Sequence, residues 1–225
     1  MSGALRLDDV ELTVHGRQIL QRLSIEFEPG LITAVSGPSG SGKTSLLSVA
    51  GGLLTPSAGS TTYEDRPMWQ GAGDPRPEVV FVLQVYGLVP ILSAWENVAV
   101  ALRARGVDPD EVGERAQAAL DRFHIGDLGD RQVEELSGGQ MQRVACSRAF
   151  VVGADILLAD EPTSELDEGN RDHVMAELRR EAEAGRIVVV ATHDDAVVAV
   201  TDRHYILDEG RLSDHVAPVT RHSAR

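Results

Sequence analysis

The sequence has little of what disulfide-linked, nucleic-acid-binding and membrane-spanning proteins carry. A single cysteine, Cys146, excludes a disulfide within the chain and suits a reducing compartment. No lysine- or arginine-rich run is present and the formal net charge is -14, so we expect no nucleic acid partner. No apolar run approaches the roughly 20 residues of a membrane helix, and the N-terminus lacks an apolar signal core. We therefore expect a chain that does not cross a membrane by itself.

What is present is the composition of a globular α/β protein. The 225 residues, 42% hydrophobic and 25% charged, suffice for one well-packed domain or one domain that carries a lobe. Two N-terminal segments, 4–14 and 18–28, approximate the period-two alternation of strands, and further short strands are expected within 55–67. Apolar strands are then expected over 31–37, 78–84, 155–160 and 187–193, helices over 44–54 and 168–185, and a terminal hairpin over 204–213.

The pattern changes after residue 85, where helical spacing replaces the strand pattern. Ser93 and Glu96 form a capping-box pattern at the start of a first helix. A second helix carries apolar residues on one face from Val112 to Phe123, and the segment LSGGQ, residues 136–140, opens a third. We therefore expect a helical lobe inserted from about residue 86 to about residue 152.

The segment GPSGSGKT, from Gly37 to Thr44, fits the phosphate-binding pattern G-x-x-x-x-G-K-[ST] between a strand and a helix. Its backbone amides would wrap phosphates at a helix N-terminus, Lys43 would reach the β- and γ-phosphates, and Thr44 would offer its hydroxyl to Mg²⁺. A glycine turn without a ligand is the alternative, and the lysine, the threonine and the flanking elements argue against it. The residues expected to contact ATP here are Gly37, Pro38, Ser39, Gly40, Ser41, Gly42, Lys43, Thr44 and Ser45.

Polar side chains also follow three other apolar strands. Asp160 could hold Mg²⁺ and Glu161 could orient or deprotonate the attacking water. Gln84 and His193 end their strands in the same manner, and parallel strands deliver these ends to one edge of the sheet. His193 could therefore contact the γ-phosphate, and Gln84 could sense both the metal and the water. The alternative for the two acids is an acidic strand end that faces solvent, and the phosphate loop in the same chain argues against it. A lone histidine at a strand end is usually structural.

The order GPSGSGKT, Gln84, LSGGQ, ILLADE, SELD and His193 resembles the ATP-binding subunit of ABC transporters, from about residue 5 to about residue 213. The resemblance implies two copies paired head to tail. Ser137, Gly138, Gly139 and Gln140 of one copy would then grip the γ-phosphate bound by the other, and Asp167 would lie across the same interface. A helix that begins at LSGGQ presents free amides to an anion, which agrees with that role. A serine-capped helix start is the ordinary alternative.

The resemblance also implies a fold and a set of boundaries. The fold is an α/β P-loop NTPase (RecA-like) core with an N-terminal antiparallel β subdomain and an inserted α-helical signature subdomain. The single ATPase domain is expected over residues 4–214, and a loose tail over 215–225. Within the domain, 1–85 and 153–214 would form the core with its β subdomain, and 86–152 the helical subdomain.

Two positions depart from the usual pattern of the family. ABC domains commonly stack tyrosine on the adenine, and the matching position is His15, whose imidazole could stack but which could also be a surface turn residue. Glu165 stands in SELD where alanine is commoner, while Asp167 is retained. Neither departure touches the phosphate chemistry, so we expect an active ATPase.

The segment after Gln84 resembles the branch of lipoprotein-release and macrolide-export ATPases, which includes a cell-division member. We therefore expect ATP and Mg²⁺ as cofactors, a homodimer, and integral membrane permease subunits, with Tyr86 and Leu88 as candidate contacts. The protein would lie peripherally on the cytoplasmic face of the cell membrane and energise export or release of a substrate. A non-transporting mechanotransmission complex and an ABC importer remain the alternatives. A DNA-repair ABC ATPase would carry a long coiled coil between the first loop and LSGGQ, and the segment here is too short for one. A translation-associated ABC ATPase would carry two motif sets in one chain, and this sequence has one.

Overall fold

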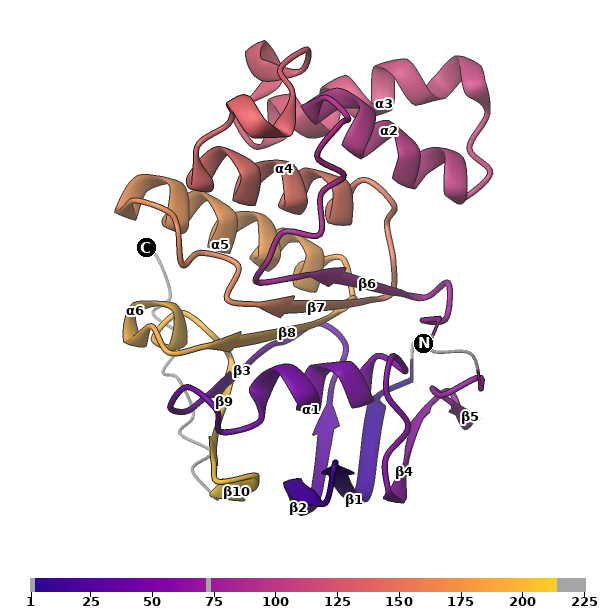
Figure 1. Cartoon of the computed structure of the whole chain (residues 1–225), viewed down its shortest axis with the longest axis vertical. Helices are drawn as coiled ribbons and strands as arrows, with labels where there is room; N and C mark the ends of the chain where they lie inside the picture. The colour runs from indigo at the N-terminus through magenta and orange to yellow at the C-terminus, as the bar shows by residue number, and fades with distance from the viewer. Residues whose placement is uncertain (1–2, 72–73, 214–225) are drawn as a thin grey trace.

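The structure, a computed structural model, describes residues 3–71 and 74–213, which form two sheets and the helices that pack on them (Figure 1). Residue 214 and the expected tail, 215–225, lie outside the described residues.

A six-stranded sheet lies at the centre of the molecule, in the order β10-β9-β3-β8-β7-β6. Its strands are parallel except β10, which turns back on β9 as a hairpin. The four strands β3, β8, β7 and β6 are short and nearly continuously apolar, as expected for parallel strands covered on both faces. The strands are β3 (Ile32–Ser36), β6 (Val79–Val82), β7 (Ile156–Asp160), β8 (Ile187–Thr192), β9 (Arg203–Asp208) and β10 (Arg211–Ser213).

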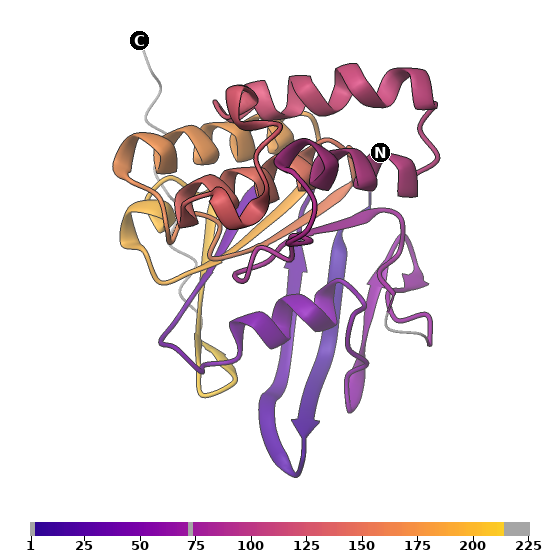
Figure 2. The same cartoon turned by 45° about the horizontal axis from the view of Figure 1, so that its top comes forward.

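Two separate cores cover the two faces of this sheet, because successive side chains of a strand point to opposite sides. Leu157 and Ala159 of β7 join one core with the helices α2 to α5, whereas Ile156 and Leu158 join the other with α1 and the N-terminal strands. Figures 1 and 2 show the central sheet between these two layers. The helices are α1 (Lys43–Ala50), α2 (Ala94–Ala104), α3 (Pro109–Arg122), α4 (Gly138–Phe150), α5 (Glu168–Glu183) and α6 (Asp195–Val198), with 3-10 turns η1 (Gly126–Leu128) and η2 (Val133–Glu135).

The N-terminal strands form a second, antiparallel sheet in the order β2-β1-β4-β5. Alternate residues of its first strand are buried, including Leu5 and Leu7, which fits a sheet with one face on the core. The expected N-terminal strands and the short strands within 55–67 are thereby confirmed. The strands are β1 (Leu5–Val14), β2 (Arg17–Phe27), β4 (Ala58–Tyr63) and β5 (Arg66–Pro67).

The three helices α2, α3 and α4 follow β6 and precede β7, and they lie together beyond the β6 edge of the central sheet (Figures 1 and 2). The expected capping box is present at the start of α2: Ser93 Oγ accepts from Glu96 N–H, and the Glu96 carboxylate accepts from Ser93 N–H. The short helix α6 was not anticipated, because its four residues are too few to show a period. Strand β6 ends at Val82, two residues before the expected end at Gln84.

Candidate active site

The phosphate-binding pattern forms a loop between β3 and α1, as the sequence predicts. A Cβ on Gly37 would lie 2.0 Å from the Leu207 carbonyl oxygen at φ +151°, so only glycine fits there. Lys43 is buried, and its Nζ donates to the carbonyl oxygens of Gly37 (2.7 Å) and Pro38 (3.2 Å). No side chain caps α1 at Gly42, so the first amides of this helix remain available to an anion.

Two acidic residues at the end of β7 face this loop. Thr44 Oγ1 donates to Asp160 Oδ2 at 2.6 Å. Burial raises the pKa of Asp160 above its usual value, and the hydrogen bond from Thr44 opposes that rise. A buried carboxylate beside a hydroxyl is an arrangement that a cation would stabilise.

Glu161 is held next to Asp160 in an unusual backbone conformation. Its φ is +50°, in the left-handed region, and its N–H donates to the Ala191 carbonyl at 2.9 Å. Its Oε1 lies 2.7 Å from His193 Nδ1. The Glu161 side chain is 8% exposed, whereas that of His193 is 68% exposed. The imidazole thus lies between the carboxylate and open solvent. Strain of this kind persists only where surrounding contacts impose it, and it concentrates at functional sites.

One cavity of about 490 Å³ joins these groups. The phosphate loop, Gln84, both acids and His193 all contribute to it, so the parallel strands do bring their ends together. Its lining is Arg17, Ile19, Ser39, Gly40, Gly42, Lys43, Thr44, Ser45, Gln84, Asp160, Glu161 and His193.

Some predicted residues lie outside this lining. His15 occupies the turn between β1 and β2 with φ +49°, and it is not among the described residues that line the cavity. Arg17 and Ile19 of β2, which the sequence analysis did not single out, do line the cavity. The stacking of His15 on adenine stays a prediction. Pro38 and Ser41 instead line a neighbouring cavity of about 420 Å³ that shares Arg17 and Ile19.

Among the described residues, neither the LSGGQ segment nor Asp167 lines the 490 Å³ cavity. Ser137 caps α4 through a capping box in which Ser137 Oγ accepts from Gln140 N–H and Gln140 Oε1 accepts from Ser137 N–H. Asp167 caps α5 by accepting from Asn170 N–H. A Cβ on Gly139 would lie 2.8 Å from the Glu165 carbonyl, so SELD packs directly against the signature glycines. Within one chain, Ser137 and Gln140 therefore cap α4, and Asp167 caps α5.

The segment after Gln84 is tied to α4 by an arginine that sequence reasoning missed. Arg148 donates to the carbonyl oxygens of Tyr86 (2.8 Å) and Gly87 (2.5 Å). Tyr86 and Leu88 are half-buried, whereas Val85 and Ile91 are each 79% exposed. The exposed apolar residues of this segment are therefore not the two that the sequence singled out.

Comparisons with known proteins identify the family of this chain. The family described as "ABC transporter" matches residues 20–164. The lipoprotein-releasing system ATP-binding protein LolD of Gluconobacter oxydans is 39% identical, over 94% of this chain and 96% of its own. The Fe(3+) ions import ATP-binding protein FbpC of Agrobacterium fabrum is 36% identical, over 96% of this chain and 62% of its own.

Solved structures extend the likeness to the fold. The dimeric structure of MJ0796, a bacterial ABC transporter cassette, matches with a TM-score of 0.86 and 28% identity, over 96% of this chain and 98% of that one. A dimeric post-hydrolysis state of the same cassette, bound to ADP and Pi, matches with a TM-score of 0.85 and 27% identity over the same shares. The predicted fold class is confirmed. In the part of the chain that the structure describes, no helix has the length and apolar character needed to span a membrane.

Proposed function

Because the chain belongs to the ABC transporter ATP-binding family, we propose that it hydrolyses ATP as a homodimer and thereby drives release or export of a substrate by separate membrane subunits. The observation that carries the proposal is the single cavity in which Lys43, Asp160, Glu161 and His193 meet.

The phosphates of ATP would lie against the loop from Gly37 to Ser45. Its amides, the start of α1 and Lys43 supply positive charge where the transferred γ-phosphoryl group needs it, which is the largest part of catalysis in phosphoryl transfer. On nucleotide binding, Lys43 would exchange its two carbonyl partners for phosphate oxygens. Glu161 would take a proton from the attacking water, and His193 would contact the γ-phosphate.

Three oxygen donors that line the cavity fit Mg²⁺. Thr44, Asp160 and Gln84 offer a hydroxyl, a carboxylate and an amide oxygen to one cavity, and a hard cation prefers such ligands. Mg²⁺ commonly keeps several waters and shares phosphate oxygens, so one carboxylate with neutral oxygen donors is a sufficient protein contribution. When bound, Mg²⁺ would neutralise charge on the β- and γ-phosphates.

The LSGGQ segment completes the site from a second copy. Ser137, Gly138, Gly139 and Gln140 begin a helix but lie outside their own chain's cavity, so a nucleotide bound by another copy is the anion we assign to them. Asp167 would lie across the same interface. ATP would then close the dimer, and loss of the γ-phosphate would reopen it.

The membrane subunits would dock on the segment that follows Gln84, through its exposed apolar side chains Val85 and Ile91. The protein would lie on the cytoplasmic face of the cell membrane. A release- or export-type transporter is favoured because the segment after Gln84 resembles that branch, and the LolD relative is 39% identical over 94% of this chain. Import and mechanotransmission are the competing assignments. We also infer that residues 86–152 act as one helical subdomain, because α2, α3 and α4 are consecutive along the chain and each packs on the other two.

The test uses Glu161→Gln, which keeps the side-chain volume and removes the carboxylate. Hydrolysis is expected to fall by about two orders of magnitude or more, the scale of a lost general base, while ATP still binds. With the γ-phosphate retained, the closed homodimer should accumulate in sedimentation with Mg-ATP.

Adding Ser137→Arg should abolish that dimer without removing ATP binding. Ser93→Arg is the matched control, because Ser93 caps α2 through the same kind of capping box. The control loses a cap, worth about 1 kcal/mol, but should leave the dimer intact. Normal hydrolysis by the Glu161→Gln variant, or a dimer that survives Ser137→Arg, would contradict the proposal.

A further inference from the structure

Thr192 is the last residue of β8 and is completely buried. Strand β8 pairs with β7 in parallel register, with Ala191 opposite Asp160, so Thr192 lies beside Glu161. The Thr192 side chain does not line the 490 Å³ cavity formed by the described residues, so it acts on bound ATP only through another group.

The hydroxyl of Thr192 has a fixed direction. Its Oγ1 lies 3.0 Å from the Asp194 backbone nitrogen and 3.2 Å from Glu161 Oε2. The Asp194 N–H can only donate, so the oxygen of Thr192 accepts there. The single hydroxyl hydrogen is then free for Glu161, whose carboxylate can only accept.

Three successive residues therefore hold Glu161. The Ala191 carbonyl accepts its N–H, Thr192 donates to Oε2, and His193 Nδ1 lies 2.7 Å from Oε1. With both oxygens engaged, the carboxylate plane is fixed before a water arrives. The residue is also held at φ +50°, a conformation that an unconstrained glutamate would leave.

We propose that Thr192 is a positioning residue for ATP hydrolysis, which orients the Glu161 carboxylate toward the attacking water. The inference rests on the proposed function, because it needs Glu161 to act on that water. Thr192 also links the carboxylate to the turn that carries His193, since its oxygen accepts the Asp194 N–H and Asp194 caps α6. The Thr192 hydroxyl thereby fixes the Glu161 carboxylate relative to the turn that carries His193.

The test compares Thr192→Val, which removes the hydroxyl at nearly constant volume, with Thr192→Ser, which keeps it. We expect kcat of the valine variant to fall about tenfold, the scale of one hydrogen bond to a charged group, with the KM for ATP changed less than about twofold. The serine variant should recover most of the rate.

Thr33→Val is the matched control, because Thr33 is a buried threonine on the neighbouring β3 whose hydroxyl has no hydrogen-bond partner among the described residues. It should retain the wild-type rate, and the melting temperatures of all three variants show whether they fold. If the serine variant is as slow as the valine variant, or if the Thr33 control loses as much activity, Thr192 has only a packing role and the inference is overturned.

A double variant separates this inference from the proposed function. In a Glu161→Gln background, Thr192→Val should cause no further loss of kcat, because no carboxylate remains to be oriented. If Glu161→Gln alone hydrolyses normally, the proposed function fails. If Glu161→Gln is inactive but Thr192→Val hydrolyses at the wild-type rate, only the role of Thr192 fails.

Discussion

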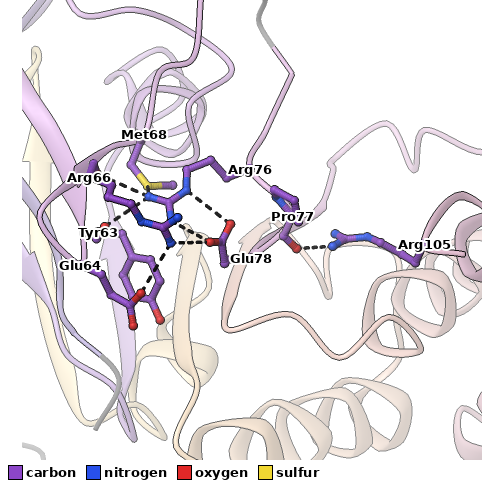
Figure 3. Close-up of polar contacts among 8 residues, drawn as sticks. All are labelled: Tyr63, Glu64, Arg66, Met68, Arg76, Pro77, Glu78 and Arg105. Carbon is purple, nitrogen blue, oxygen red and sulfur yellow. Dashed lines mark hydrogen bonds and ion pairs between the residues drawn. The ribbon is translucent and has the colours of Figure 1, made fainter.

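A partly buried ion pair just before β6 is expected to make this protein less stable as the pH becomes acidic. Arg76 is 2% exposed and donates from Nη2 (2.7 Å) and Nε (3.3 Å) to the two oxygens of Glu78 (Figure 3). Arg66 donates to the same carboxylate at 2.7 Å. The hydrogen bond from Arg76 is the largest cause that lowers the pKa of Glu78 from its usual 4.5 to about 2, against the opposing effect of burial.

The sign and size of the effect follow from this pKa. A carboxyl whose pKa is lower in the folded state stabilises the fold above its unfolded pKa, and the stabilisation disappears as the pH falls toward the folded pKa. For Glu78 the full contribution is about 3 kcal/mol at neutral pH, and about 2 kcal/mol of it is lost between pH 5 and pH 3.

The perturbation is Glu78→Gln, measured by urea unfolding at several pH values. The amide does not titrate, and the change leaves the buried Arg76 without its counter-ion, so the variant should be less stable than the wild type by about 3 kcal/mol at pH 7. This difference should shrink to about 1 kcal/mol at pH 3. Glu26→Gln is the control, because Glu26 forms an exposed pair with Arg6 at 3.4 Å, and its effect should be below about 1 kcal/mol. Parallel stability curves for the wild type and Glu78→Gln between pH 5 and pH 3 would refute the reasoning.

Two further predictions concern the cavity and the core. Arg17→Ala should raise the KM for ATP a few-fold with little change in kcat, because Arg17 lines the cavity. His15→Ala should leave the KM unchanged, because His15 is not among the described residues that line it. Steady-state kinetics in which only His15→Ala raised the KM would contradict this prediction. Gly51→Ala should lower the free energy of unfolding by about 1–3 kcal/mol, since its Cβ would lie 2.1 Å from the Phe81 ring. Gly113→Ala, in open space on α3, should instead raise it by up to about 1 kcal/mol, and equal effects of the two in urea unfolding would reject the packing argument.

Much of the site could be predicted because its signals are local. The glycine, lysine and threonine pattern of the phosphate loop needs only its own strand and helix, and Ser93 and Ser137 cap their helices through residues three positions away. The apolar runs predicted the central strands because a strand covered on both faces must be apolar throughout. The family resemblance then supplied the roles, and the comparisons bear out the family and the fold.

Some residues around the cavity could not be found in this way, because their parts depend on contacts between distant segments. Arg17 lines the cavity from β2 of the other sheet, whereas His15, two residues earlier in the turn, is not among the described residues that line it, and no local pattern distinguishes the two positions. Arg148 grips the carbonyls after Gln84 from 61 residues away, and backbone carbonyls carry no sequence signal.

By itself, the sequence determined which segments become strands and helices and where phosphate, acid and signature groups stand along the chain. Only the tertiary structure decided which of them meet. The order β3-β8-β7-β6 places Glu161 against the end of β8, where Thr192 and His193 hold its two oxygens. Hydrophobic periodicity records which faces are buried but not which strand lies beside which. That choice is made by packing over the whole sheet, so the orientation of a catalytic carboxylate is a property of the fold.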